Sequence, residues 1–326
     1  MAIASNTSLT YSSVAIREDL SDVIYNIAPM DTPFMSGCSK TTADNTFFEW
    51  QVDSISAGAA NRKIEGDDNI AATARVLPTR LGNYCQISQY VNQTSGTDQV
   101  MNYAGHGKHQ AYQLAKNGKR MKRDMESMLT QNIIRAAGDA TEARATAGIP
   151  AWINTAHVAG GSGGSPAAGS LGTTAMVQNS STAAITEANI KATIKECYDA
   201  GGSPDMMLVP SAVKQTISGL SQTVSELRTA ANKAAPASVV AAVDVYVSDF
   251  GTFRIVPDRN LAKDGPGSVA ANVFFLDMDY WAMAWLRPFQ TVDLAKTGDS
   301  VKQLLVAEYG LVSKNEKASA ILASVS

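Results

Sequence analysis

Charged and reactive side chains are scarce in this sequence of 326 residues. Charged residues make up 17% of it, below the roughly 25% typical of soluble domains. There are only 3 histidines and 3 cysteines. Cys38, Cys85 and Cys197 are far apart, and no pair has C-x-x-C spacing. They therefore predict free thiols in a reducing compartment, and exclude a disulfide framework or a zinc site built on cysteine pairs.

Long apolar runs and a basic excess are absent as well. No run of roughly 18 apolar residues occurs, so we expect no transmembrane helix and no contact with a membrane. Residues 1–11 have neither a basic start nor an apolar stretch, so we expect no signal peptide. The net charge of -3 does not suggest a dedicated nucleic-acid-binding protein. Because the hydrophobic content of 45% is ordinary, the low charge indicates that part of the surface is buried in subunit interfaces.

Catalytic motifs are weak throughout. Residues 160–164 match the G-x-S-x-G nucleophile elbow around Ser162, but that motif needs a strand before it and a helix after it. Here it lies in a Gly/Ser/Ala loop at residues 160–174, which is flexible by composition. His106 and His109 are three residues apart without a cysteine or carboxylate pattern to complete a metal site. We therefore expect no catalytic residue, no metal and no cofactor, and a serine hydrolase using Ser162 is a distant alternative.

The first 45 residues contain too little apolar material for an independent core. A short helix is predicted at residues 17–26, and Pro29 and Pro33 end it. Two interpretations remain open for this segment, a frayed terminus or an arm that lies on a neighbouring molecule. We favour the arm.

Residues 46–98 have the pattern of a long β-hairpin. Two extended runs at residues 46–55 and 76–91 flank a polar tip at residues 61–73. Since a lone two-stranded hairpin is marginal in water, it must pack on this chain or on another. We predict that the tip contacts a neighbouring subunit through Arg62, Lys63, Glu65, Asp67 and Asp68. The three acidic residues could instead bind a cation, although a solvated tip is the simpler interpretation.

A long amphipathic helix is predicted at residues 102–137. Leu114, Met121, Met125 and Met128 recur at helical spacing on one face, and basic residues lie on the opposite face: Lys116, Lys119, Arg120 and Arg123. At roughly 1.5 Å per residue such a helix would exceed about 50 Å. Asp124 and Glu126 are spaced to pair with Arg120 and Lys122. The basic face is either solvated or in contact with phosphates.

The rest of the chain mixes helices and strands. Helices are predicted at residues 187–200 and 211–220. Strands are predicted at residues 206–209, 239–247, 252–256, 273–276 and 281–286, with Arg287-Pro288 breaking the last, and residues 301–312 are expected to be extended. This order indicates an α+β fold rather than regular βαβ alternation, and the length favours two subdomains.

Short motifs in a fixed order along nearly the whole chain resemble those of one family. They are EDLSDVIYNIAP at residues 18–29, DTPF at 31–34, EWQVD at 49–53, EG at 65–66, NYCQI at 83–87, SDFG at 248–251, LRP at 286–288, LAKTGDS at 294–300 and NEKA at 315–318. Together they resemble the major capsid proteins of tailed bacteriophages with the Hong Kong 97 fold, in the group similar to that of the phage SU-ten.

The resemblance implies an N-terminal arm at residues 1–45, an E-loop hairpin at 46–100, a P-domain with a spine helix and flexible loop at 101–175, an A-domain at 176–290 and a C-terminal return at 291–326. It also implies self-assembly into hexamers and pentamers of an icosahedral or prolate shell around double-stranded DNA, built in the host cytoplasm. Portal, decoration or scaffolding proteins are the implied partners. The family places the spine helix on the inner side of the shell, so the basic face would face the genome. Another phage structural protein, such as a tail or decoration subunit, is the nearest alternative.

Overall fold

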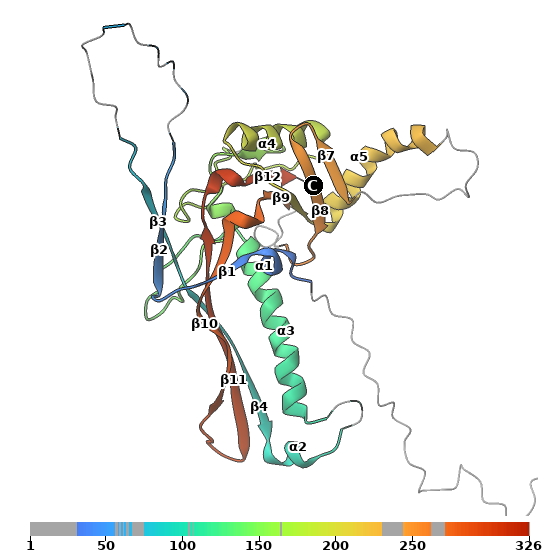
Figure 1. Cartoon of the computed structure of the whole chain (residues 1–326). Helices are drawn as coiled ribbons and strands as arrows, with labels where there is room; N and C mark the ends of the chain where they lie inside the picture. The colour runs from blue at the N-terminus through green and yellow to red at the C-terminus, as the bar shows by residue number, and fades with distance from the viewer. Residues whose placement is uncertain are drawn as a thin grey trace, which may run out of the picture.

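The computed structural model describes residues 31–55, 58, 60, 62, 65–66, 75–103, 105, 107–163, 165–229, 244–261 and 271–325. The helix expected at residues 17–26 lies outside them. Figure 1 shows a body of mixed helices and strands, from which the β2–β3 hairpin projects on one side and helix α3, with the strands beside it, on the other. The fold is α+β, as the sequence indicated.

The elements follow one another without regular alternation. The helices are α1 (Pro33–Gly37), α2 (Gly96–Val100), α3 (His109–Thr130), α4 (Glu187–Asp199) and α5 (Ser211–Thr229), with 3-10 turns at Ile149–Ala151, Met278–Tyr280 and Glu316–Ala318. The strands are β1 (Ser39–Thr42), β2 (Phe47–Val52), β3 (Thr79–Tyr84), β4 (Gln86–Ser95), β5 (His157–Ala159), β6 (Met206–Val209), β7 (Val245–Ser248), β8 (Gly251–Pro257), β9 (Ala271–Leu276), β10 (Trp281–Leu294), β11 (Ser300–Ser313) and β12 (Ala320–Val325).

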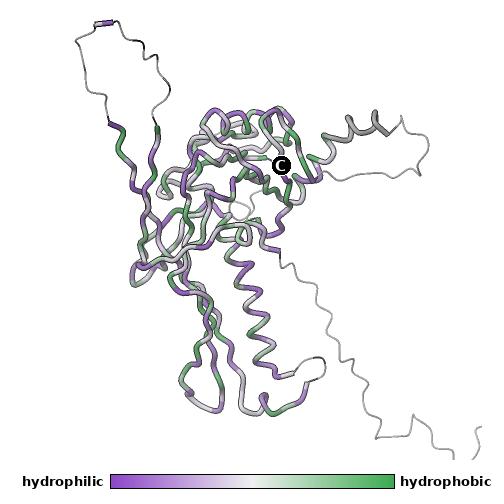
Figure 2. Tube along the Cα trace, viewed as in Figure 1, coloured by the Kyte–Doolittle hydropathy of each residue, from purple (hydrophilic) through white to green (hydrophobic). Residues whose placement is uncertain are grey.

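A four-stranded sheet in the order β1-β10-β11-β4 supports helix α3. Side chains of β4 alternate between the helix and solvent, so that Asn92 accepts a hydrogen bond from Asn117 of the helix while Val91 is exposed. Thr94 donates to Gln110 of α3 at 2.8 Å. Figure 2 shows hydrophobic and hydrophilic residues in turn along these strands. One face of the sheet thus holds α3, and part of the other is open.

The hairpin is shorter than its sequence suggested. β2 and β3 pair antiparallel from Phe47↔Tyr84 to Val52↔Thr79. The prediction of one return strand through residue 91 was wrong, because the chain changes sheets at Cys85 and β4 pairs with β11 instead. Both runs are extended, and periodicity alone does not reveal which partner an extended segment takes.

Helix α3 covers His109–Thr130, and the predicted helix at residues 102–137 was therefore too long. Before the helix, Gly105 has a φ of 82°, a left-handed conformation that interrupts a right-handed helix. After it, Gln131 is extended with a ψ of 153°, and Ala136 pairs with Ala145 in an isolated β-bridge. At 22 residues, the helix is about 33 Å long rather than more than 50 Å.

A six-stranded sheet in the order β5-β12-β9-β6-β8-β7 forms the body. The strands predicted at residues 239–247 and 252–256 pair as β7 and β8 where they are described, and the predicted strand at residues 206–209 is β6. Residues 239–243 lie outside the described part of the chain. α5 extends nine residues beyond the predicted end at residue 220, to Thr229. Arg287-Pro288 does not end its strand. The pairing of β10 with β11 shifts register between Trp285 and Gln290, and the strand then continues to Leu294.

Two large hydrophobic clusters share this six-stranded sheet. Along β9, Phe274 and Leu276 belong to the cluster that includes Met121, Met125 and Trp152, whereas Val273 and Phe275 belong to the cluster under α4 and α5. The sheet therefore has a core on each face. One of these cores is continuous with the four-stranded sheet and α3.

Candidate functional surfaces

The hairpin is fixed to the body at its base. The indole Nε1 of Trp50 donates to the carbonyl of Ser313 at 2.8 Å, and the ring of Trp50 lies 5.4 Å from that of Trp152. Arg135, from the segment after α3, donates to the carbonyl of Gly82 and stacks over the ring of Phe47. These hydrogen bonds and ring contacts, made by β11 and two loops, fix the orientation of the hairpin relative to the body.

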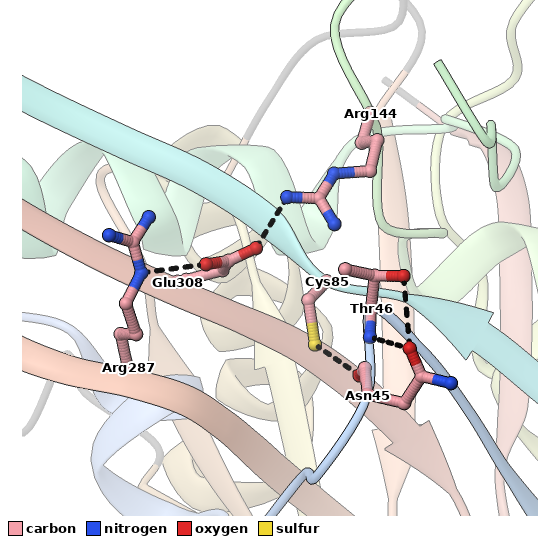
Figure 3. Close-up of polar contacts among 6 residues, drawn as sticks. All are labelled: Asn45, Thr46, Cys85, Arg144, Arg287 and Glu308. Atoms are coloured by element: carbon pink, nitrogen blue, oxygen red, sulfur yellow. Dashed lines mark hydrogen bonds and ion pairs between the residues drawn. The ribbon is translucent and has the colours of Figure 1, made fainter. Parts of the chain in front are cut away.

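At the base, the chain passes from β3 to β4 through the buried Cys85. Cys85 donates its backbone N–H to the carbonyl of Thr46 at 2.8 Å, and its thiol lies 3.8 Å from the carbonyl of Asn45 (Figure 3). Asn45 Oδ1 accepts the backbone N–H of Thr46 at 2.7 Å. Burial and nearby Glu308 raise the pKa of Cys85 to about 11. At neutral pH the thiol is therefore protonated and unreactive, and its role is packing.

Glu308 on β11 pairs with two arginines from other parts of the chain. Its Oε1 accepts from Arg144 at 2.5 Å, and its Oε2 accepts from Arg287 Nε at 2.8 Å. Figure 3 shows the carboxylate between the two guanidinium groups. The Glu308 side chain is 4% exposed, and those of Arg144 and Arg287 are 23% and 44% exposed. Sequence reasoning missed this cluster, although a lone glutamate in the apolar run of residues 304–312 was a signal for it.

Beyond the base, the hairpin carries apolar side chains into solvent. Ile55 is fully exposed, Leu77 is 76% exposed and Val76 is 49% exposed. Of the predicted tip residues, Arg62 and Glu65 are exposed, while Lys63, Asp67 and Asp68 lie outside the described residues. The structure thus brings none of the tip residues into a site within the described chain.

Most residues of the predicted basic face of α3 are exposed at the surface. Lys116, Lys119 and Arg120 are exposed, whereas Arg123 is half-buried. The guanidinium of Arg120 lies 4.8 Å from the ring centre of Tyr90. Arg120 and Arg123 each lie 3.9 Å from Asp124, so the predicted pairing of Arg120 with Asp124 is confirmed. Among the described residues, neither lysine forms an ion pair, and they carry the uncompensated charge.

The opposite face of α3 is buried, and it includes a glutamate as well as apolar side chains. Met121 and Met125 are buried as predicted, but Met128 is only half-buried and Leu129 takes its place in the core. Glu126 does not pair with Lys122. It is fully buried, and its two oxygens accept the backbone N–H groups of Phe34 and Met35 at 2.7 and 2.8 Å. Its position three residues before Leu129, on the buried side, could have indicated this.

Other predicted features have no chemistry assembled around them. Ser162 lies in a loop, where its hydroxyl contacts that of Ser181 at 3.2 Å, and strand β5 before it is not followed by a helix until α4. His109 begins α3, 5.2 Å from the ring of Tyr103. In the described ranges, no group of three or more His, Cys, Asp or Glu residues could hold a metal ion. The described helices include none long and apolar enough to cross a membrane.

Comparison with known sequences identifies related capsid proteins. Residues 3–326 match the family described as SU10 major capsid protein. The major capsid protein of Escherichia phage Phieco32 is 26% identical over 328 residues, covering 91% of this chain and 90% of that protein.

Solved structures agree on the architecture. A chain of the cyanophage A-1(L) capsid asymmetric unit matches with a TM-score of 0.65 at 12% identity, covering 95% of this chain and 97% of that chain. A chain of the capsid of a native GTA particle has a TM-score of 0.61 at 12% identity, over 98% and 100% of the two chains. The fold is the Hong Kong 97-like capsid fold. With the family match over nearly the whole sequence, this chain belongs to the SU10 major capsid protein family and is a shell-forming major capsid protein of a tailed phage.

Proposed function

We propose that this chain assembles with copies of itself into hexamers and pentamers of an icosahedral or prolate shell that encloses double-stranded DNA. In this assembly residues 1–45 act as an arm, the hairpin within 46–100 as an E-loop, 101–175 as a P-domain, 176–290 as an A-domain and 291–326 as a C-terminal return. Portal, decoration or scaffolding proteins complete the virion capsid, which is built in the host cytoplasm. The chain has no catalytic role in this proposal.

The exposed apolar side chains of the hairpin carry this proposal. Ile55, Val76 and Leu77 would cost free energy in water, at about 25 cal/mol for each Å² of apolar surface left uncovered. A two-stranded hairpin with a free apolar stretch is marginal by itself. A neighbouring subunit that covers this stretch, together with the polar tip around Arg62, Lys63, Glu65, Asp67 and Asp68, would explain both features.

The triple variant Ile55→Ser, Val76→Ser, Leu77→Ser tests the hairpin contact. Because all three side chains are exposed in the subunit, circular dichroism and the unfolding midpoint should stay near those of the original chain. Electron microscopy of the purified variant should show few or no closed shells. The matched control is Val100→Ser, which removes a side chain that is 79% exposed on α2. Normal shells from the triple variant would contradict the proposal.

We also propose that the basic face of α3 looks toward the packaged DNA. Lys116 and Lys119 supply most of the free charge, since Arg120 and Arg123 share Asp124. A contact of this kind screens phosphate repulsion without reading base sequence, and salt weakens it.

The double variant Lys116→Glu, Lys119→Glu tests this orientation. Shells should still form, because both lysines are exposed, while the DNA retained per shell should fall and should become more sensitive to added salt. The control Arg254→Glu, Lys317→Glu makes the same charge change at exposed positions on β8 and in the turn at Glu316–Ala318, outside α3. Equal DNA retention in the two variants would show that α3 does not face the genome.

A further inference from the structure

The N-terminal segment enters the body through residues 31–38, which we call the arm root. Phe34 is fully buried and packs edge-to-face on Trp281, with ring centres 5.8 Å apart. Asp31 accepts a hydrogen bond at its carbonyl from Asn260 Nδ2 at 2.7 Å. The arm root therefore contacts the loop after β8 as well as strand β10, before the chain continues into β1.

Glu126 is the polar link between the arm root and α3. Its carboxyl oxygens accept the backbone N–H groups of Phe34 and Met35, which lie 92 and 91 residues away in the sequence. These are the first amides of the short helix α1, which have no partner within that helix. A single side chain near the C-terminal end of α3 thus satisfies two backbone amides of the arm root.

The surroundings of Glu126 do not favour a negative charge. The residue is fully buried, and no cation pairs with it in the described part of the chain. The titratable groups near it are the carboxyl of Asp258, from the loop after β8, and the thiol of Cys38, at the end of the arm root. Asp258 in turn faces the carboxyl of Asp31 in the arm root, and Cys38 faces Lys314. Asp258 is 2% exposed, and its Oδ2 has no hydrogen-bond partner among the described residues.

We propose that Glu126, together with Asp258, forms a proton-operated clasp that holds the arm root against α3 while Glu126 is protonated and loosens when both carboxyls are ionised. Two buried carboxylates without a cation repel each other and have lost their hydration. These effects outweigh the two amide hydrogen bonds, which favour the ionised form, so a proton bound to Glu126 stabilises the closed site. The inference goes beyond assembly itself, because it concerns how firmly each subunit holds the start of its own arm.

The direction of the pH effect follows from the same surroundings. Burial and the nearby carboxyl of Asp258 together raise the pKa of Glu126 from 4.5 to about 7, against the two backbone hydrogen bonds that lower it. Burial raises the pKa of Asp258, which hydrogen bonds from Asn260 oppose. Because the closed form binds its proton more tightly than the open form, the clasp is fully closed below pH 4.5. It weakens as the pH rises to about 7.

Amide hydrogen exchange of the purified full-length subunit tests the clasp. A peptide spanning residues 31–38 is followed from pH 4.5 to 8.5, with the intrinsic pH dependence of exchange divided out. The opening constant should rise about tenfold per pH unit up to about pH 7 and then level off, since one unit of pKa shift is a factor of ten. A flat profile in the original chain would overturn the proposal.

Three variants separate the clasp from a merely structural glutamate. Glu126→Gln should abolish the pH slope. Asp258→Asn removes the like charge, so the slope should end at a lower pH. Glu142→Gln changes an exposed carboxylate and should leave the profile unchanged. The proposal fails if Glu126→Gln keeps the original slope or if Asp258→Asn leaves its upper end in place.

Discussion

Glu308 interrupts an otherwise apolar stretch of β11, and its two arginine partners come from other parts of the chain. Arg144 belongs to the segment between α3 and the turn at Ile149–Ala151, and Arg287 lies at the irregular part of β10. The glutamate therefore links the segment that follows α3 to two strands of the four-stranded sheet, β10 and β11. A buried carboxylate of this kind helps to specify which segments pack together, and it also affects the stability of the fold.

Replacing Glu308 with Gln should lower the free energy of unfolding by about 1–3 kcal/mol. The loss should be smaller than for a fully buried pair, because Arg287 and Arg144 are 44% and 23% exposed and water can reach them. Urea unfolding at neutral pH measures it. Glu49→Gln removes an exposed pair with Arg80 and should change stability by at most about 1 kcal/mol. Equal effects of the two changes would mean that the Glu308 cluster contributes no more than a surface pair.

Sequence reasoning found the apolar residues more reliably than the buried polar ones. Met121 and Met125 follow from helical periodicity alone. The partners of Glu126 and Glu308 do not, since each lies more than 20 residues away in the sequence and the pairing depends on the tertiary fold. Local charge spacing even favoured the wrong partner for Glu126, because a possible pair with Lys122 says nothing about which face is buried.

At the scale of elements, the type of each segment was more predictable than its ends and partners. The strand at residues 206–209 and the helix at Glu187–Asp199 were found because turn residues bound them on both sides. β4 was assigned to the hairpin because its change of sheet at Cys85 leaves no break in the extended pattern. Pro288 indicated a strand end, but β10 contains it at a register shift, where the lost N–H is tolerated.

Helix α3 offers a test of how far local propensity limits its stability. Gly118 lies in the interior of the helix, and a Cβ built there would meet no atom within 4 Å. Gly118→Ala should therefore raise the free energy of unfolding by about 0.5–1 kcal/mol, because alanine loses less backbone entropy. Thermal unfolding measures this gain.

Gly148→Ala is the contrasting change, since a Cβ there would lie 2.0 Å from the carbonyl oxygen of Gln131. That variant should be destabilised, because the backbone at the end of α3 would have to move. If Gly118→Ala were also destabilised, backbone entropy at this position would not be what limits the stability of α3.

At the scale of the whole molecule, the sequence favoured two subdomains, and the structure joins them through one sheet. The side chains of β9 and β12 alternate between the two main hydrophobic clusters, so neither core is complete without the six-stranded sheet. Contact with α3 and the four-stranded sheet on one face and with α4 and α5 on the other makes the subunit continuous. Its family, by contrast, could be recognised from short motifs in a fixed order along the chain.

If the subunit unfolds cooperatively, a mutation in one hydrophobic cluster should shift the unfolding midpoint measured by a probe in the other cluster. All 4 tryptophans belong to, or pack against, the cluster that contains Met125. Ile194 of α4 is buried in the other cluster. Ile194→Ala should cost about 2–5 kcal/mol, the usual range for a buried isoleucine, if its site cannot collapse. Because the clusters share the sheet, tryptophan fluorescence should show the same lowered urea midpoint as far-ultraviolet circular dichroism. A fluorescence transition that stays in place while the circular dichroism transition moves would mean that the two cores unfold separately.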